Sequence, residues 1–413
     1  KQKTAYEIRP RDWSSDVCSS DLVRAAIVGP DDRPATPAEL AAMAAEVETA
    51  LAGGAWGFST GLVYPPGSFA ATDEIVAVAA PLRAHDALYA SHIRSEASGL
   101  LDAVAEAIAI GSAHGVRVQV SHLKALGRRN HGRAKDAVAL IADARARGLR
   151  VTADAYPYAA GATFLSQVLP PWVHDGGTSE LLARIGSTEV RARIRREIET
   201  GLPGWSNYVD GAGGWGGIRI AACVDPRNRG LEGGLVDRLA SGLGRDPLDV
   251  VCDALILDRG ATLMIAHFMA DADVDEVYRA PFTAVGSDQL GVLPPDTRVH
   301  PRAYGTFARL VGPWVRERGL LDLATAIHRA TGLAASILGL ADRGVVAEGA
   351  VADLVLLDPH RLTDRSTYEE PTRLATGVEA VWLAGRTAIE GGIVVDDRLG
   401  RVVRRPLRRS AGS

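Results

Sequence analysis

The chain has 413 residues, of which 47% are hydrophobic and 23% charged, and its formal net charge is -4 at pH 7. This composition is that of a globular protein and excludes a disordered or collagen-like chain. The negative balance argues against nucleic acid or an anionic membrane surface as a partner. No apolar run approaches the roughly 20 residues of a membrane span. The three cysteines, at positions 18, 223 and 252, follow no metal-binding or disulfide spacing.

The first 22 residues differ from the rest of the chain. They contain KQKTAYEI and, over residues 12–22, DWSSDVCSSDL, which both resemble sequencing-adapter DNA translated in frame. We therefore predict that residues 1–22 are a disordered, adapter-like artefact, that Cys18 takes no part in chemistry, and that the true N-terminus is missing. The compartment is left open, with the cytoplasm as the default expectation.

From Val23 onward, helical and strand-like patterns alternate. The TPAE sequence beginning at Thr36 contains a capping box with proline at the first helical position, which predicts a helix that ends at Gly53. The apolar runs that follow predict short strands with helices between them, the strands lying at residues 55–60, 87–92, 116–122 and 149–154. The strand ends lie 30 to 32 residues apart. This is the length of one βα unit and predicts a parallel sheet.

The later part of the chain falls into three pieces. An irregular, glycine-rich stretch predicts an insertion at about residues 160–261, after which strands are expected at 263–267 and 283–288. From Gly344 the pattern predicts strands and a hairpin. The predicted domains are therefore a partial barrel over 23–343, which contains the insertion, and a small β module over 344–413. No glycine-rich phosphate loop follows the strands, which disfavours a nucleotide-binding sheet.

Three of the expected strands end in side chains suited to hydrolysis, namely His92, His122 and Asp288. In a (β/α)8 barrel the carboxyl ends of the strands form the active-site face. Two imidazoles and a carboxylate on that face can bind zinc and leave a position open for water. From the pattern alone, structural histidines and a capping carboxylate remain an equal alternative.

Several long motifs follow one another along the chain: AWGFSTGLVYPPG, ASHIRSE, VSHLK, DAYPY, GSDQ, HPRAYGTF and LGLADRGVVAEGAVADLVLLDP. Together, from about Val23 to Val395, they resemble the N-acyl-D-amino-acid deacylases, or D-aminoacylases, of the amidohydrolase superfamily. The resemblance implies an α/β fold, a deformed (β/α)8 TIM-type barrel of the metal-dependent hydrolase kind with a small β-sandwich. The family's His-x-His pair and early cysteine ligand have no counterpart here. The barrel is therefore expected to be incomplete, and the chain as written to be inactive.

The resemblance also implies roles for the three strand-end residues. His92 and His122 match zinc ligands, and Asp288 matches the catalytic aspartate that takes a proton from water and returns it to the leaving amine. The implied substrate is a small molecule, an N-acyl-D-amino acid, which is cleaved to a carboxylate and a free D-amino acid.

The carboxylate of such a substrate needs a cationic partner. Lys124, two residues after His122, and Arg302 are the candidates, because both can pair with a carboxylate. The hydroxyl groups of Tyr64 and Tyr156 are expected nearby. For Arg302 and the tyrosines, ordinary loop packing is an equally good interpretation.

Two alternatives remain from the sequence. A cyclic-amide hydrolase of the hydantoinase or dihydroorotase kind is disfavoured, because such enzymes usually carry a carboxylated lysine on strand 4. Here the matching strand ends in Phe58-Ser59-Thr60. A non-catalytic fragment is the other alternative. The sequence does not indicate which D-amino acid side chain or which acyl group the substrate carries. It also leaves open the number of metal ions and the oligomeric state.

Overall fold

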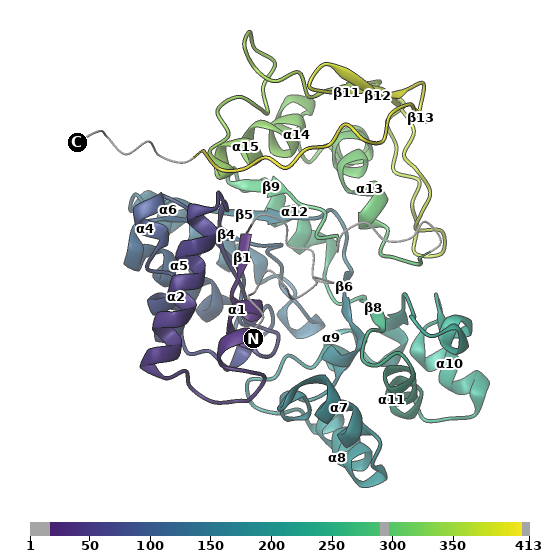
Figure 1. Ribbon diagram of the computed structural model, residues 1–413. Coiled ribbons are helices and arrows are strands. Elements are labelled where there is room, and N and C mark those ends of the chain that lie inside the picture. The colour runs from purple at the N-terminus through teal and green to yellow at the C-terminus, as the bar shows by residue number, and fades with distance from the viewer. Residues whose placement is uncertain (1–16, 290–296, 407–413) are drawn as a thin grey trace.

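The computed structural model describes residues 17–289 and 297–406 (Figure 1). Its centre is a parallel sheet of six strands in the order β1-β2-β3-β4-β5-β9. These strands are β1 (Val17–Ser19), β2 (Gly57–Gly61), β3 (Leu88–His92), β4 (Arg117–Val120), β5 (Val151–Ala155) and β9 (Thr283–Val285). Within the described part of the chain the sheet stays open between β1 and β9. The predicted strands that end near residues 60, 92, 122 and 154 are thus confirmed.

The helices between these strands pack on the sheet and share one hydrophobic core with it, in which Phe58, Tyr89 and Val118 are buried. The capping box is confirmed, because Thr36 accepts from the backbone N–H of Glu39 and the Glu39 carboxylate accepts from that of Thr36. The helix predicted over residues 72–83 is divided in two. The helices of this region are α1 (Ser20–Ile27), α2 (Pro37–Ala52), α3 (Thr72–Val78), α4 (Leu82–His85), α5 (Leu100–His114), α6 (Ala134–Ala146) and α12 (Asp271–Arg279).

The stretch predicted as an insertion forms a second body with its own hydrophobic core, at the lower right of Figure 1. It contains an antiparallel sheet in the order β6-β8-β7, built from β6 (Gly161–Phe164), β7 (Ile218–Ile220) and β8 (Leu263–Ala266). Its helices are α7 (Gly177–Ile185), α8 (Thr188–Thr200), α9 (Tyr208–Gly211), α10 (Val236–Leu243) and α11 (Pro247–Leu257).

The strand at residues 263–267, predicted as a return to the βα rhythm, belongs instead to this antiparallel sheet. Ala266 pairs with Gly161 on β6 and with Ile218 on β7. A short apolar run specifies a buried strand but carries no information on the direction of its partners. The prediction that this strand continues the barrel is therefore wrong.

The chain then runs through α13 (Arg302–Arg309), a π-helix (Leu310–Arg318), α14 (Leu323–Ala330) and α15 (Gly332–Leu338). An antiparallel sheet follows, in the order β10-β11-β12-β13. Its strands are β10 (Leu354–Leu357), β11 (Val378–Leu383), β12 (Arg386–Glu390) and β13 (Ile393–Val394). The predicted hairpin is confirmed as β11 and β12, which are joined at Ala384-Gly385, both with positive φ. This sheet is the described part of the expected β module.

The start of the described chain corrects one prediction. Residues 1–16 lie outside the described residues, but residues 17–22, predicted to be disordered, are ordered. Val17–Ser19 pairs in parallel with β2, and Ser20 is buried at the start of α1. The prediction failed because a strand edge offers unpaired backbone groups to any extended segment, whatever its side chains. In the described part, no helix has both the length and the hydrophobicity needed to cross a bilayer.

Candidate metal centre and active site

The parallel sheet brings the predicted strand-end residues to one edge. His92 is the last residue of β3, His122 follows β4 by two residues, and Asp288 follows β9 by three. The rings of His92 and His122 lie 4.3 Å apart, centroid to centroid, and meet edge to face. His122 has a φ of 38° and Asp288 a φ of 49°. Positive φ is uncommon for residues other than glycine and is often found at functional sites.

A buried carboxylate on the neighbouring strand holds the turn after β4. The backbone N–H of His122 donates to Asp154 Oδ1 at 2.8 Å, and Gln119 Nε2 donates to Asp154 Oδ2 at 2.6 Å. Burial raises the pKa of Asp154 above its ordinary value. Asp154 therefore fixes the position of His122 through the backbone, a role that the sequence reasoning did not identify.

Glu96, in the loop after β3, is a second residue that the sequence reasoning missed. Its Oε1 lies 3.0 Å from Nδ1 of His122 and 4.0 Å from Nε2 of His92. Its backbone carbonyl accepts from the N–H of Leu126 at 2.7 Å, which ties the loops after β3 and β4 together. The ASHIRSE motif contained the signal, since a carboxylate four residues after a strand-end histidine can reach the same edge of the sheet.

The donor atoms present here fit zinc. One ligand atom each from His92, Glu96 and His122 lie within 4.8 Å of one another. Burial lowers the pKa of His92 to about 3, and its neighbour His122 adds to this, so the imidazole is neutral as metal binding requires. Its buried Nε2 has no hydrogen-bond partner among the described residues. Neutral imidazoles with a nearby carboxylate are ordinary zinc donors.

Lys124 is a buried cation that contacts two members of this cluster. Its Nζ lies 2.8 Å from His122 Nδ1 and donates to Glu96 Oε1. Burial alone would raise the pKa of Glu96, but the neighbouring charge of Lys124 and a hydrogen bond with His122 hold it below the ordinary range. Glu96 is therefore an ionised carboxylate that faces the Nδ1 side of His122.

A second buried cation stands beside Asp288. Arg302, the first residue of α13, places Nη1 2.8 Å from Asp288 Oδ2. Its guanidinium also lies 4.6 Å from the centroid of the Tyr156 ring, and Lys124 Nζ lies 5.7 Å from the same centroid. Burial would raise the pKa of Asp288, but Arg302 and the other cations hold it below its ordinary value. Lys124, Tyr156, Arg302 and Asp288 thus form one continuous group.

Two of the three nearby tyrosines lie beside the cluster, and the third lies outside it. The ring of Tyr64 packs edge-on against His92 at 4.9 Å, and its hydroxyl is hydrogen-bonded to Oγ1 of Thr163 at 2.9 Å. Tyr158 instead hydrogen-bonds Asp364 Oδ2 at 2.8 Å. Tyr64 and Tyr156 therefore lie beside the cluster as expected, whereas Tyr158 serves the packing against the C-terminal region.

Comparison with known proteins is consistent with this arrangement. The model of an amidohydrolase family (Amidohydro_3) matches residues 20–389. The chain is 37% identical over 388 residues to the N-acyl-D-aspartate deacylase of Alcaligenes xylosoxydans xylosoxydans, covering 92% of this chain and 66% of that protein. It is 36% identical over 383 residues to the D-aminoacylase of the same organism, covering 93% and 68%.

Solved structures give the same result. A crystal structure of D-aminoacylase superposes with a TM-score of 0.76 at 36% identity, over 93% of this chain and 70% of that one. The N-acyl-D-glutamate deacylase of Bordetella bronchiseptica, solved with zinc and a phosphonate inhibitor, superposes with a TM-score of 0.76 at 32% identity, with the same coverage.

The fold and the sequence together define the class. The chain belongs to the amidohydrolase family, and the resemblance to the N-acyl-D-amino-acid deacylases is confirmed. The expected α/β fold, an incomplete barrel of the metal-dependent hydrolase kind with a separate antiparallel sheet, is confirmed with it. The chain spans about two thirds of the length of the curated relatives that it matches.

Proposed function

We propose that this protein is a zinc-dependent hydrolase that cleaves the amide bond of N-acyl-D-amino acids to a carboxylate and a free D-amino acid. One observation carries the proposal. Two candidate zinc ligands, His92 and His122, share an edge of the sheet with a carboxylate, Asp288, and with two buried cations. A substrate with a carboxylate next to a hydrolysable amide matches this combination, and the names of the relatives support the same substrate class.

Zinc at His92 and His122 would polarise the amide carbonyl and make water a stronger acid. Glu96 Oε1 lies 3.0 Å from Nδ1 of His122, and with the ring proton at Nδ1 the Nε2 lone pair would be available to the metal. Asp288 is ionised, because its pKa is held low beside Arg302, and it accepts the proton of the attacking water. It then returns this proton to the nitrogen of the leaving amine.

The two cations bind the substrate. Arg302 presents a planar guanidinium suited to a carboxylate, and that group lies over the ring of Tyr156. Lys124 supplies a second positive charge, with Nζ 5.7 Å from the centroid of the same ring. Both groups are buried, so their attraction for an anion is stronger than it is in water. They hold the α-carboxylate and so orient the amide toward Asp288.

Cyclic amides are the competing substrates. The strand that matches strand 4 of the family is β2, and it contains Phe58, Ser59 and Thr60 but no lysine. Thr60 is hydrogen-bonded to Tyr89 and Ser91 within the sheet, so its side chain stabilises the core. These observations support a linear amide as the substrate.

The test compares linear with cyclic amides. The product of the complete open reading frame that encodes this chain is loaded with zinc and given N-acetyl-D-leucine, 5-isobutylhydantoin and dihydroorotate. We expect hydrolysis of the linear amide alone. Faster opening of either ring would overturn the proposal. That the substrate is a small molecule, that no nucleic acid or membrane takes part, and that the protein is cytoplasmic all stay predictions.

A further inference from the structure

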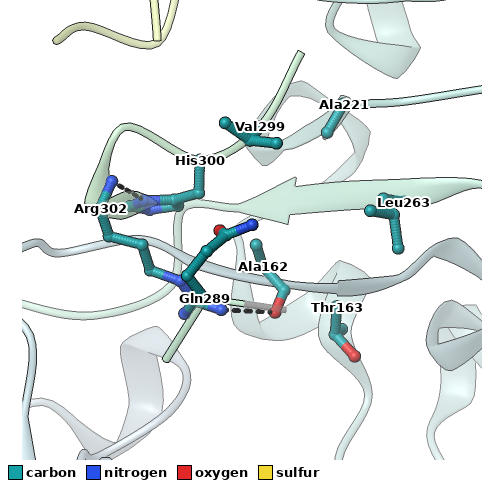
Figure 2. A pocket seen from close by; sticks show the side chains of 8 residues that line it. All are labelled: Ala162, Thr163, Ala221, Leu263, Gln289, Val299, His300 and Arg302. Carbon is teal, nitrogen blue, oxygen red and sulfur yellow. Dashed lines mark hydrogen bonds between the residues drawn. The ribbon is translucent and has the colours of Figure 1, made fainter. Parts of the chain in front are cut away.

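His300 precedes α13 and lies beside Arg302 (Figure 2). It belongs to the HPRAYGTF motif, and neither the candidate zinc ligands nor the proton transfer assigned to Asp288 uses it. Only 2% of its surface is exposed. A polar ring is costly to bury unless its hydrogen bonds are made, so the partners of the two ring nitrogens indicate what the ring does.

Both ring nitrogens of His300 are hydrogen-bonded to backbone groups. Nδ1 lies 3.0 Å from the backbone nitrogen of Arg302, and Nε2 lies 2.9 Å from the carbonyl oxygen of Ala160. Because a backbone N–H donates and a carbonyl oxygen accepts, Nδ1 is the acceptor and Nε2 carries the proton. Burial, with the charge of Arg302, lowers the pKa of His300 well below its ordinary value, so the ring is neutral. One tautomer therefore makes both bonds.

The bond to Arg302 takes the place of a helix cap. The first N–H groups of a helix have no partner within it, and a side chain just before the helix commonly accepts from one of them. The residue before α13 is Pro301, whose side chain has no acceptor. His300 accepts instead from the N–H of Arg302, and its own carbonyl oxygen accepts from the N–H of Ala303 at 3.0 Å. His300 therefore holds the first turn of α13, which carries Arg302.

The backbone and the guanidinium of Arg302 are both linked to β6. The backbone reaches Ala160, just before β6, through the ring of His300. The guanidinium donates from Nη2 to the carbonyl oxygen of Ala162, on β6, at 3.3 Å, as Figure 2 shows. Its Nη1 lies 2.8 Å from Asp288 Oδ2. Because an arginine side chain has many rotamers, these fixed points decide where its charge lies.

The ring of His300 is itself held by aromatic neighbours. Tyr158 and Tyr368 meet it edge to face, with centroids 5.2 Å and 5.3 Å away. In the same region, Oγ of Ser366 donates to the carbonyl oxygen of Pro301 at 3.0 Å. The ring and the start of α13 are thus supported from the C-terminal region as well as from β6.

We propose that His300 is a positioning residue for the substrate carboxylate, because it accepts the backbone N–H of Arg302 and so sets where the Arg302 guanidinium lies. The inference rests on the proposed function, in which Arg302 binds that carboxylate, and it adds a residue on which this binding depends. In this role His300 needs no contact with the substrate. Its loss impairs recognition of a carboxylate more than hydrolysis of an amide that lacks one.

The experiment measures the preference for a carboxylate. The zinc-loaded product of the complete open reading frame is given N-acetyl-D-leucine and its neutral counterpart, N-acetyl-D-leucinamide, and the release of acetate gives kcat/KM for each. The ratio of the two values reports how well Arg302 is placed. We expect the unmodified protein to prefer the carboxylate. Hydrolysis of neither compound would overturn the proposed function and this inference with it.

Three variants isolate the bond to Arg302. His300→Gln places its amide one carbon farther out, so no acceptor remains at the position of Nδ1. We expect the ratio to fall roughly tenfold, mainly through a higher KM for N-acetyl-D-leucine. His300→Asn keeps an acceptor, because an asparagine side chain reaches the N–H two residues on, and should hold the ratio within about threefold of the original. The matched control is His114→Gln, at a histidine whose Nε2 lies 2.8 Å from the carbonyl oxygen of Val76, and it leaves the ratio unchanged.

The ratio separates positioning from a general role in the fold. A ring that only stabilised the fold would, when replaced, lower kcat/KM for both substrates alike. An unchanged ratio in His300→Gln, a His300→Gln protein that does not fold, or a fall in His300→Asn as large as that in His300→Gln would each overturn the inference. All three results would leave the proposed function intact.

Discussion

Nη1 of Arg302 lies 2.8 Å from Oδ2 of Asp288, so one ion pair joins the group proposed to bind the substrate carboxylate to the group proposed to move the proton. Arg302 is the first residue of α13, and Asp288 follows β9. The pair helps to keep Asp288 ionised. In the proposed function, a substrate bound at Arg302 would present its amide near Asp288, and this single contact would couple binding to proton transfer.

The proton-transfer role of Asp288 is tested with Asp288→Asn. Asparagine keeps the shape and one oxygen but cannot accept and return a proton, so we expect kcat to fall by roughly 100-fold or more. Zinc content, measured by mass spectrometry, should stay at the level of the unmodified protein. Asp136→Asn, on the exposed face of α6, is the control. A variant that retained zinc and a near-normal kcat would refute the role.

Glu96 is tested as the residue that orients His122. Glu96→Gln removes the charge that faces Nδ1 of His122 and the charge that offsets Lys124. Because partners of this kind fix the tautomer of a metal-binding histidine, we expect the dissociation constant for zinc to rise roughly 10- to 100-fold. A chelator competition assay measures it, and Glu189→Gln, at an exposed position of α8, is the control. Unchanged zinc affinity in Glu96→Gln would show that His122 is oriented without Glu96.

The close approach of two central strands can be tested at Gly57. A Cβ atom on this residue would lie 2.0 Å from the carbonyl oxygen of Leu88 on β3, so Gly57→Ala is expected to lower the free energy of unfolding by about 1–3 kcal/mol. A Cβ atom on Gly242, within α10, would instead meet no atom of the described residues within 4 Å. Gly242→Ala should therefore be neutral or stabilising by roughly 0.5–1 kcal/mol. Urea denaturation of both variants checks this, and equal effects would contradict the packing described.

Much of the central sheet was predictable because each strand is short, apolar and followed by a polar residue at a regular interval. His92 and His122 came together as expected, since parallel strands place their carboxyl ends at one edge. Asp288 was expected at that edge because it ends the strand predicted at residues 283–288, although the roles of these residues stay proposals. Resemblance supplied the family, which periodicity alone did not distinguish from other parallel α/β folds.

The parts that were not predictable depend on partners far away in the sequence. The direction of β8 is set by β6 and β7, which no local pattern in residues 263–267 reveals. Glu96 and Asp154 act on His122 across loops and strands, so their roles are visible only in three dimensions. Residues 17–19 pair with β2 through backbone groups, and this pairing cannot be read from their composition.

The most direct test of the proposed function is the release of leucine from racemic N-acetyl-leucine by the zinc-loaded product of the complete open reading frame. Chiral chromatography separates the two enantiomers of the product. We expect D-leucine alone, with release abolished by removal of zinc and by His122→Ala, because that change removes a proposed ligand. Release of L-leucine at a comparable rate, or D-leucine release that persists without zinc or without His122, would contradict the proposed function.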